Sequence, residues 1–343
     1  MIRSAFAICL SAALLVACSS TPPAPAPSSP ATTTAVPTTS APITTSAAAP
    51  TSTLPAVPVS APLLGPGPVL AVKIDNTSPA RPRIGVDAAD IVYVEPVEAG
   101  LTRLLAIYAS TLPPEVGPVR SARESDAVLL GNYGRVAFAY SGASPITTSE
   151  IVKGPQINVS MDSGGGGYRR AGDRKAPYNV IGTPAALVAR AGGSAPAGDI
   201  GFRTGPGASG GRPATSLATA YPLARVAFTW DATLGRYLVT TDGRPEVTAA
   251  GTPVSAASVL VQMIRTHPST NRDVNGVFTP VLELLGKGEA KVLRGGAAYD
   301  ATWERATNAS PTRLTGSSGA EVTLAAGPLW VLLVPVGQSV TIS

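Results

Sequence analysis

The chain has 343 residues and a formal net charge of +5, and its single histidine is His267. Both cysteines, Cys9 and Cys18, fall within the first 18 residues. A globular part without cysteine has no disulfide, thiol nucleophile or cysteine metal site, and one histidine cannot build a histidine-rich metal site. The small positive excess is also too low for a nucleic-acid-binding surface. We therefore predict no metal, no cofactor and no nucleic-acid partner.

The N-terminus has the features of an export signal. Arg3 precedes an apolar run from Ala5 to Ala17, which is too short for a membrane span but suits the core of a signal peptide. Leu15-Val16-Ala17-Cys18 is similar to a bacterial lipobox, so residues 1–17 are predicted to be removed and Cys18 to be lipidated, for example with palmitate. The alternative is an ordinary signal peptide with an incidental cysteine. Lipidation would anchor the chain on the outer face of the cytoplasmic membrane.

Residues 18–67 are predicted to be a disordered tether. Ser, Thr, Pro and Ala make up almost all of this segment, and residues 19–72 carry no charge. Such a composition cannot bury enough apolar surface to offset its chain entropy. The tether would hold the folded part away from the membrane.

The folded part is predicted to begin near Val69, with an N-terminal domain over 68–200. Strands are expected at 69–74, 91–97 and 102–109, and helices at about 125–132, 145–152 and 184–190. A two-residue turn at Ala99-Gly100 would place Pro96 opposite Arg103 and Glu98 diagonally beside Arg103. Pro96 would then mark an edge strand or a bulge. Ser121 or Ser125 is expected to cap the first helix.

A second, β-rich domain is predicted over 201–343. Residues 191–222 are rich in small residues and suggest a loop between the halves. The strands expected after it lie at 226–230, 237–241, 258–264, 289–293, 298–303, 321–324 and 329–334, in an antiparallel-looking arrangement, with 258–264 central because it is almost wholly apolar. The fold class is therefore α+β, with mixed and antiparallel sheets, few short helices and a β-rich C-terminal half.

Charged side chains gather at turns and strand ends in residues 73–123. The carboxylates are Asp75, Asp90, Glu95 and Glu98, and the arginines are Arg81, Arg103, Arg120 and Arg123. The carboxylates can form ion pairs with the arginines, bind a ligand, or act as a general acid–base pair on a glycan. Arginines just ahead of a helix suit a phosphate or carboxylate, although a loop clamped to the hairpin carboxylates explains them equally well.

Two further stretches offer weaker signals. Gly164–Gly167 lacks the Gly-Lys-Ser/Thr ending of a phosphate-binding loop and is interpreted as a flexible loop. Four basic residues follow it, namely Arg169, Arg170, Arg174 and Lys175. They fit either an anionic polymer or a solvated loop. His267 precedes Pro268 and is expected to be a solvated loop residue rather than a catalytic one.

Residues 73–179 contain a set of short motifs, namely Lys73-Ile74-Asp75-Asn76, Ala80-Arg81-Pro82, Ala89-Asp90-Ile91-Val92-Tyr93, Glu98 with Leu101-Thr102-Arg103, Gly117-Pro118-Val119-Arg120-Ser121-Ala122-Arg123, Ser141-Gly142-Ala143-Ser144-Pro145, Tyr168-Arg169-Arg170 and Arg174-Lys175-Ala176-Pro177-Tyr178-Asn179. Together these motifs resemble those of the YerB-type lipoproteins of Gram-positive bacteria, a family built from domains of unknown function. Looser matches are Gly286–Gly288, Thr302-Trp303 and Gly327-Pro328-Leu329-Trp330.

This resemblance implies an N-terminal and a C-terminal family domain on a lipid-anchored, exported protein, and no established activity. It implies a role in the cell envelope, with peptidoglycan or a penicillin-binding protein as candidate partner. Many relatives carry histidine at two places where this chain has Tyr140 and Tyr178. Chemistry that depends on those imidazoles is therefore not expected here, whereas a binding role is compatible with tyrosine.

The leading hypothesis is a non-catalytic envelope lipoprotein that binds a wall component or a wall-assembly protein through a polar cleft. The alternatives are a carboxylate-dependent glycan-active enzyme and a sensor of a small anionic ligand. The predicted ligand-binding residues are Asp75, Asn76, Arg81, Asp90, Glu98, Arg103, Arg120, Ser121, Arg123, Arg170, Tyr178 and Asn179, and no catalytic residue is assigned.

Overall fold

The computed structural model describes residues 60–192, 194–207, 210–273 and 275–343. The predicted signal peptide, Cys18 and most of the predicted tether lie outside these ranges. Strand is much more abundant than helix, which confirms the α+β, β-rich class. Within the described ranges, no helix is long and apolar enough to span a bilayer.

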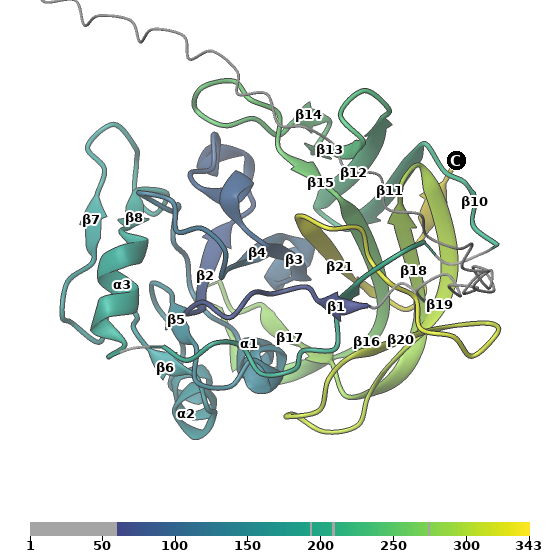
Figure 1. Ribbon diagram of the computed structural model, residues 1–343. Helices are drawn as coiled ribbons and strands as arrows, with labels where there is room; N and C mark the ends of the chain where they lie inside the picture. The colour runs from purple at the N-terminus through teal and green to yellow at the C-terminus, as the bar shows by residue number, and fades with distance from the viewer. Residues whose placement is uncertain (1–59, 193, 208–209, 274) are drawn as a thin grey trace, which may run out of the picture. The chain divides into compact units, whose positions relative to one another are not determined.

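One large mixed sheet contains strands from both halves of the chain, and β21 lies beside β3 at the point where the halves meet (Figure 1). Its order is β10 (Arg212–Pro213), β19 (Ala297–Arg305), β18 (Gly286–Arg294), β16 (Ser258–Arg272), β21 (Leu329–Pro335), β3 (Ile91–Pro96), β4 (Thr102–Tyr108), β2 (Leu70–Asp75), β5 (Ala137–Ala139) and β6 (Ile157–Asn158). In addition, β17 (Phe278–Glu283) pairs with β16, and β20 (Arg313–Gly316) with β19.

A second sheet packs against one face of the large sheet. Its order is β14 (Arg244–Pro245), β13 (Arg236–Thr241), β12 (Ala224–Asp231), β11 (Ser216–Tyr221) and β22 (Val340–Ile342), with β15 (Ser255–Ala256) paired to β13. Two short ladders complete the strands, β1 (Ala61–Pro62) with β9 (Arg203–Thr204) and β7 (Tyr168–Arg170) with β8 (Val180–Gly182). The folded structure therefore extends to Ala61, earlier than the start predicted near Val69.

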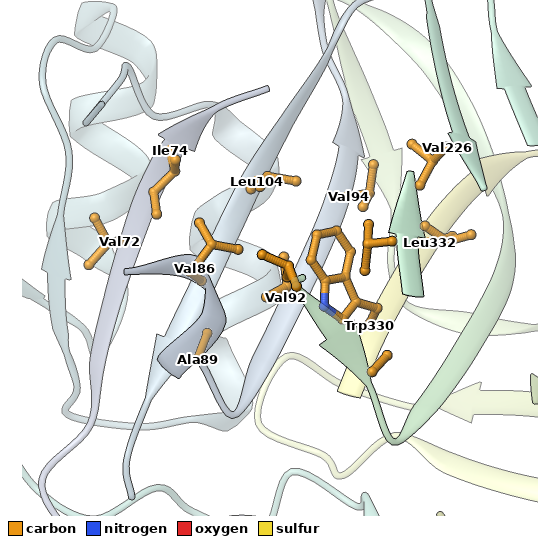
Figure 2. Close-up of a cluster of buried hydrophobic side chains, with 14 of the residues drawn as sticks. Val72, Ile74, Val86, Ala89, Val92, Val94, Leu104, Val226, Trp330 and Leu332 are labelled. Carbon is orange, nitrogen blue, oxygen red and sulfur yellow. The ribbon is translucent and has the colours of Figure 1, made fainter. Parts of the chain in front are cut away.

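Alternation along the central strands supplies two cores, one on each face of the large sheet. Val92 and Val94 of β3 face the core shared with the second sheet (Figure 2). In this core Phe228 packs edge-on against Trp330, with ring centroids 5.7 Å apart. Tyr93, between the two valines, faces the other core. Because both faces are covered, every residue of β3 is buried. Burial of each large apolar side chain contributes about 1.5–3 kcal/mol.

The helices are short and cover the sheet locally. Among the described residues they are α1 (Glu124–Leu129), α2 (Pro145–Lys153) and α3 (Pro184–Arg190), with 3-10 turns η1 (Ser78–Ala80), η2 (Val86–Ala88), η3 (Glu98–Gly100) and η4 (Leu130–Asn132). All three α-helices lie close to the predicted positions. Neither predicted serine caps α1, however. Its N-cap residue is Arg123, whose backbone N–H donates to the Asp126 side chain, and Ser125 lies inside the helix.

The connection between β3 and β4 corrects the predicted hairpin register. The turn is a five-residue loop closed by the Val97 N–H donating to the Leu101 carbonyl at 2.8 Å, with Ala99 at φ 57°. Pro96 therefore faces Thr102, and Glu95 rather than Pro96 faces Arg103. The edge-strand prediction is wrong as well, because β3 lies between β4 and β21. Its partner β21 pairs only with residues 91–94, so Pro96 lies beyond that ladder.

The C-terminal strands form a mixed arrangement rather than the antiparallel-looking one expected for them. β16 runs parallel to β21, and β21 runs parallel to β3. The predicted loop at 191–222 contains β11, an interior strand of the second sheet that pairs with β12 and β22. Beyond Ile264, β16 continues with β17 as a long hairpin, the arm (residues 265–283). His267 is thus an exposed strand residue of the arm, not a loop residue.

Candidate functional site

A cavity of about 620 Å³ opens where β2 and β3 end and β4 begins. Six segments of the chain surround it: the end of β2, the β3–β4 connection, the stretch before α1, the start of α2, the loop at 177–178 and the arm. Its lining residues are Asp75, Thr77, Val97, Glu98, Ala99, Leu101, Thr102, Arg103, Arg120, Ser121, Ala122, Arg123, Ala143, Ser144, Thr147, Pro177, Tyr178, Asn271, Arg272, Asp273, Asn275 and Thr279.

Strand register explains why charges meet here. Arg103 on β4 is directly opposite Asp75 on β2 and Glu95 on β3. Side chains directly opposite on neighbouring strands share a face of the sheet. The last row of the sheet therefore carries three charged residues. In the next row on the same face, Leu105 lies between Tyr93 and the buried Lys73.

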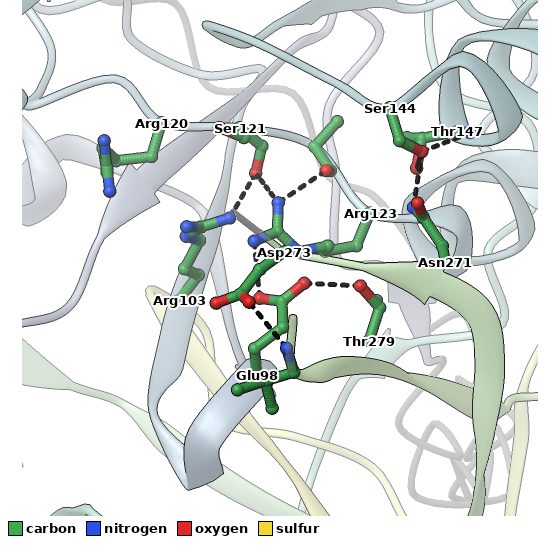
Figure 3. Close-up of polar contacts among 12 residues, drawn as sticks. Glu98, Arg103, Arg120, Ser121, Arg123, Ser144, Thr147, Asn271, Asp273 and Thr279 are labelled. Carbon is green, nitrogen blue, oxygen red and sulfur yellow. Dashed lines mark hydrogen bonds and ion pairs between the residues drawn. The ribbon is translucent and has the colours of Figure 1, made fainter. Parts of the chain in front are cut away.

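Arg103 contributes a guanidinium to the cavity that forms no ion pair in the described part of the chain. Its Nη1 donates to the Ser121 carbonyl at 2.9 Å, and it makes no ion pair with any carboxylate of the described residues (Figure 3). Burial, followed by the nearby charges of Arg123 and Arg120, lowers its pKa to about 10, although the carboxylates of Glu98 and Asp75 act in the opposite direction. The guanidinium is therefore still charged at neutral pH.

Arg120 is held by Asp75 at the end of β2. Its Nε donates to Asp75 Oδ2 at 2.8 Å, and the Asp75 Oδ1 also accepts from the Thr77 N–H at 2.7 Å. The guanidinium carbon lies 5.7 Å from the centroid of the Tyr178 ring, within the range of a cation–π contact. The Nη atoms of Arg120 make no hydrogen bond to another described residue, so they are available to a ligand.

Glu98 is fixed by an arginine and a hydroxyl from the arm. Arg123 Nη2 donates to Glu98 Oε2 at 2.5 Å, and Thr279 Oγ1 donates to Glu98 Oε1 at 2.5 Å. Burial alone would raise the pKa of Glu98, but the hydrogen bond and charge of Arg123, together with Thr279, lower it below its ordinary value. Glu98 is therefore an ionised, hydrogen-bonded carboxylate. The predicted pairing of Glu98 with Arg103 is wrong.

The opposite wall of the cavity is polar, and its charged residues are Arg272 and Asp273 of the arm. Ser144 caps α2 by accepting from the Thr147 N–H at 3.1 Å, and its hydroxyl donates to Thr147 Oγ1 at 3.0 Å. Asn271 of the arm donates its amide Nδ2 to Ser144 Oγ. This contact joins residues 127 positions apart in the chain. The arm is thus part of the wall.

A fully buried triad of charged side chains supports the arginines from beneath. Lys73 Nζ contacts Glu95 and lies 2.6 Å from Asp126 Oδ1. The other Asp126 oxygen accepts from the Arg123 N–H at 2.6 Å, and the Lys73 carbonyl accepts from the Arg120 N–H at 2.9 Å. Burial, and then the Asp126 carboxylate, raise the pKa of Glu95 to about 8 despite Lys73. Glu95 thus carries a proton at neutral pH, which leaves the triad without net charge.

The structure brings seven of the predicted ligand-binding residues to the cavity and places five elsewhere. The seven are Asp75, Glu98, Arg103, Arg120, Ser121, Arg123 and Tyr178. Asn76 is buried and donates to Thr102, while Arg81 pairs with Glu246 and Asp242. Asp90, at the opposite end of β3, accepts from the N–H groups of Ala109 and Ser110. Arg170 and Asn179 bond to each other on the surface.

Sequence reasoning missed the arm and the wall of α2. Asn271 and Thr279 lie about 150 residues beyond the charged stretch at 73–123, and no local pattern relates them to it. One signal exists in retrospect, since the apolar run of β16 changes at Arg265 into a polar stretch that is still extended. Lys73 was a second signal, because a lysine within an apolar strand needs a buried partner. Among the described residues no group of His, Cys, Asp and Glu is arranged to hold a metal ion.

Comparison with known families follows the same two halves. Residues 56–197 match the family described as "Protein of unknown function (DUF3048) N-terminal domain", and residues 217–331 match its C-terminal domain. The chain belongs to the DUF3048 family. The cavity of this DUF3048 chain is built from both matched regions, because Arg103 and Arg120 come from the first and Thr279 from the second.

Two similarities extend this assignment. The chain is 37% identical over 111 residues to the Bacillus subtilis (strain 168) protein named "Putative lipoprotein YerB", a match that covers 32% of this chain and 33% of that protein. It thus spans about a third of the length of this relative. The crystal structure of YerB protein from Bacillus subtilis superposes with a TM-score of 0.69 at 23% identity, over 82% of this chain and 99% of that chain. This likeness shows that the DUF3048 fold is shared.

Proposed function

We propose that this chain is an exported, lipid-anchored protein of the cell envelope. In the cavity lined by Arg103, Arg120 and Arg123 it binds an anionic group of a wall component or of a wall-assembly protein. The observation that carries the proposal is the unpaired guanidinium of Arg103. Its partly buried charge is flanked by two further arginines and forms no ion pair with a carboxylate of the described residues. A partly buried cation without a paired counterion is costly, and a bound anion would reduce that cost.

The geometry of Arg120 supports the same conclusion. Its Nε is occupied by Asp75 and its ring contact is with Tyr178, so the guanidinium plane is fixed before a ligand arrives. A fixed guanidinium presents its remaining N–H groups as a planar fork that matches a carboxylate or a phosphate. A binding site of this kind loses little side-chain entropy on complex formation.

The carboxylates favour binding over glycan hydrolysis. A general acid needs a carboxyl whose pKa is raised toward the working pH. In the cavity Glu98 has a lowered pKa, and Asp75 accepts hydrogen bonds from Thr77 and Arg120. Both side chains therefore act as supports for arginines in this proposal. The lipid anchor is proposed from the lipobox at Cys18 and from the name of the Bacillus subtilis relative.

Retention on purified peptidoglycan and on immobilised envelope proteins tests the binding proposal. Arg120→Ala is the informative variant, because the Arg120 side chain is partly exposed and its loss leaves the strands intact. Arg313→Ala removes an exposed arginine of β20 outside the cavity and is the matched control. We expect wild type and Arg313→Ala to be retained alike and Arg120→Ala to be retained at least tenfold less. Equal retention of all three proteins contradicts the proposal.

The anchor is tested separately by cell fractionation. Cys18→Ala should move the protein from the membrane fraction to the soluble extracytoplasmic fraction. Membrane retention of this variant at the wild-type level would rule out lipidation at Cys18.

A further inference from the structure

We propose that the cavity takes a singly charged, hydroxyl-rich ligand, namely a saccharide or polyol unit that carries one carboxylate or one phosphodiester. This inference rests on the proposed function, since it names the chemical class of the anion that the arginines would bind. It is carried by three properties of the cavity, namely its charge balance, its size and its polar wall.

Charge balance sets the valence of the ligand. The inner part of the cavity contains three guanidinium groups, Arg103, Arg120 and Arg123, and two carboxylates, Asp75 and Glu98. Three positive and two negative charges leave one positive charge. In the arm, Arg272 and Asp273 add one charge of each sign. A ligand with one negative charge neutralises this set, whereas a dianion would bring an uncompensated charge into a partly buried site.

The size of the cavity requires more than a simple ion. Pockets that enclose drug-sized ligands have volumes of about 300–1,000 Å³, and the volume here is about 620 Å³. A carboxylate or phosphate group bound to the arginines would fill a small part of this space. The rest of the ligand must therefore lie against the wall formed by α2 and the arm.

That wall is polar, and besides the charged pair Arg272 and Asp273 of the arm it contains Ser144, Thr147 and Asn271. Ser144 Oγ uses its proton on Thr147 Oγ1 and its two lone pairs on the Thr147 N–H and the Asn271 amide, and Thr147 is fully buried. The free capacity therefore lies on Asn271. No hydrogen bond within the described residues uses its Oδ1, and its Nδ2 has a second N–H, so the amide can both accept from and donate to ligand hydroxyls.

Tyr178 adds a flat surface on the arginine side. Its ring lies against Arg120 and is partly exposed, so the ring and the guanidinium together form an edge between the anion site and the rest of the cavity. A tyrosine offers an apolar face and a polar tip at little cost in side-chain entropy. Both fit a sugar ring, which has apolar C–H faces and hydroxylated edges.

Calorimetric titration of the full chain with small probes separates the two parts of the ligand. D-Glucuronate has one carboxylate and several hydroxyls, acetate has the charge alone, and D-glucose has the hydroxyls alone. Diglycerol phosphodiester and dimethyl phosphate form the corresponding pair for a phosphodiester. We expect at least one hydroxylated anion to bind tenfold or more tightly than its simple counterpart and than glucose. Glucose 6-phosphate, a dianion, should bind no more tightly than the better hydroxylated monoanion.

Variants assign the two contributions. Arg120→Ala should weaken all anions at least tenfold. Asn271→Ala and Tyr178→Leu should each reduce the advantage of the hydroxylated anion over its simple counterpart three- to tenfold. Only Asn271→Ala, whose side chain does not contact an arginine, should leave the affinity for the simple counterpart unchanged. Arg313→Ala should change nothing, and the thermal midpoint of each variant, measured in parallel, identifies any that fail to fold. Asn271 and Tyr178 lie on different elements, so one unfolded variant still leaves the other to decide.

The outcomes separate this inference from the proposed function. Equal affinity of glucuronate and acetate, and of the two phosphodiesters, overturns the inference and leaves an anion-binding protein. Tighter binding of the dianion overturns the charge argument. Absence of binding by every probe overturns the inference, whereas only retention of Arg120→Ala at the wild-type level contradicts the proposed function.

Discussion

Replacing Glu95 with glutamine should leave the protein at least as stable as wild type at pH 7 and should change how its stability depends on pH. Glu95 is almost wholly buried beside Lys73 and Asp126. Burial and the Asp126 carboxylate raise its pKa from 4.5 to about 8. Glutamine has the shape of the protonated acid, it can accept from Lys73, and it does not titrate.

The size of the effect follows from the raised pKa. A group whose folded pKa lies above its unfolded value binds its proton more tightly in the native state. Its contribution to stability is therefore complete below about pH 4.5 and is lost as the pH rises to about 8. At pH 7 the loss amounts to about 2.5 pH units at about 1.4 kcal/mol per unit, hence up to about 3 kcal/mol. The glutamine variant avoids this loss.

Denaturation with urea at pH 5, 6, 7 and 8 in buffer of constant ionic strength measures the effect. The free energy of unfolding of Glu95→Gln, minus that of wild type, should increase with pH across this range by about 1 kcal/mol per unit. Taking the difference cancels other groups that titrate in the same window. A constant difference between pH 5 and 8, or a variant less stable than wild type by 2 kcal/mol at pH 7, would refute the assignment of a proton to Glu95.

Lys73→Met provides the contrast, because it removes the cation and leaves two buried carboxyl groups. Breaking a buried ion pair by removing one partner costs about 3–5 kcal/mol. Because the carboxylates are also charged in the unfolded chain at pH 7, this penalty should diminish as the pH falls toward 4. A penalty of the same size at pH 4 and pH 7 would show that lost packing, rather than charge, is responsible.

Three further substitutions test other parts of the fold by urea denaturation. Glu246→Ala removes the partner of the buried Arg83 and should lower the free energy of unfolding by about 3 kcal/mol; a loss below 1 kcal/mol would contradict it. Tyr133→Phe removes one hydroxyl of the buried pair that Tyr133 forms with Tyr93 at 2.7 Å, and it should lower the free energy of unfolding by about 1–2 kcal/mol, with no change in pH dependence. Gly100→Ala places a Cβ 2.4 Å from Pro222 at φ 71° and should cost about 1–3 kcal/mol; wild-type stability would disprove the predicted clash.

Alternation and helix signals were sufficient to predict most elements of this fold. α3 begins at Pro184 and ends at Arg190, as predicted, because proline at the first helical position is a local signal. The predicted register of β3 and β4 was wrong by one residue, since register depends on the number of residues in the turn. Ala99 adopts a left-handed conformation that no sequence rule requires of alanine, and it lengthens the loop between β3 and β4.

The prediction of the site was limited by distance along the chain. Residues that lie at strand ends within 73–123 were found because neighbouring strands bring their ends together. Asp90 is also a carboxylate next to a strand end, as Asp75 is. It lies at the other end of β3, however, and accepts from backbone N–H groups. Only the topology distinguishes the two ends. The contacts of Asn271 and Thr279 depend on the parallel pairing of β21 with β3, which joins the two halves.

The buried triad and the three partly buried arginines of the cavity act together. Three guanidinium groups close together repel one another, and they remain in place because their backbones and carboxylates are fixed. Lys73 holds the backbone of Arg120 and the carboxylate of Asp126, and Asp126 in turn holds the backbone of Arg123. The cost of bringing the arginines together is thus met on folding rather than on binding. An anion that enters the cavity then relieves repulsion without reorganising the site, which is the physical basis of a preorganised receptor.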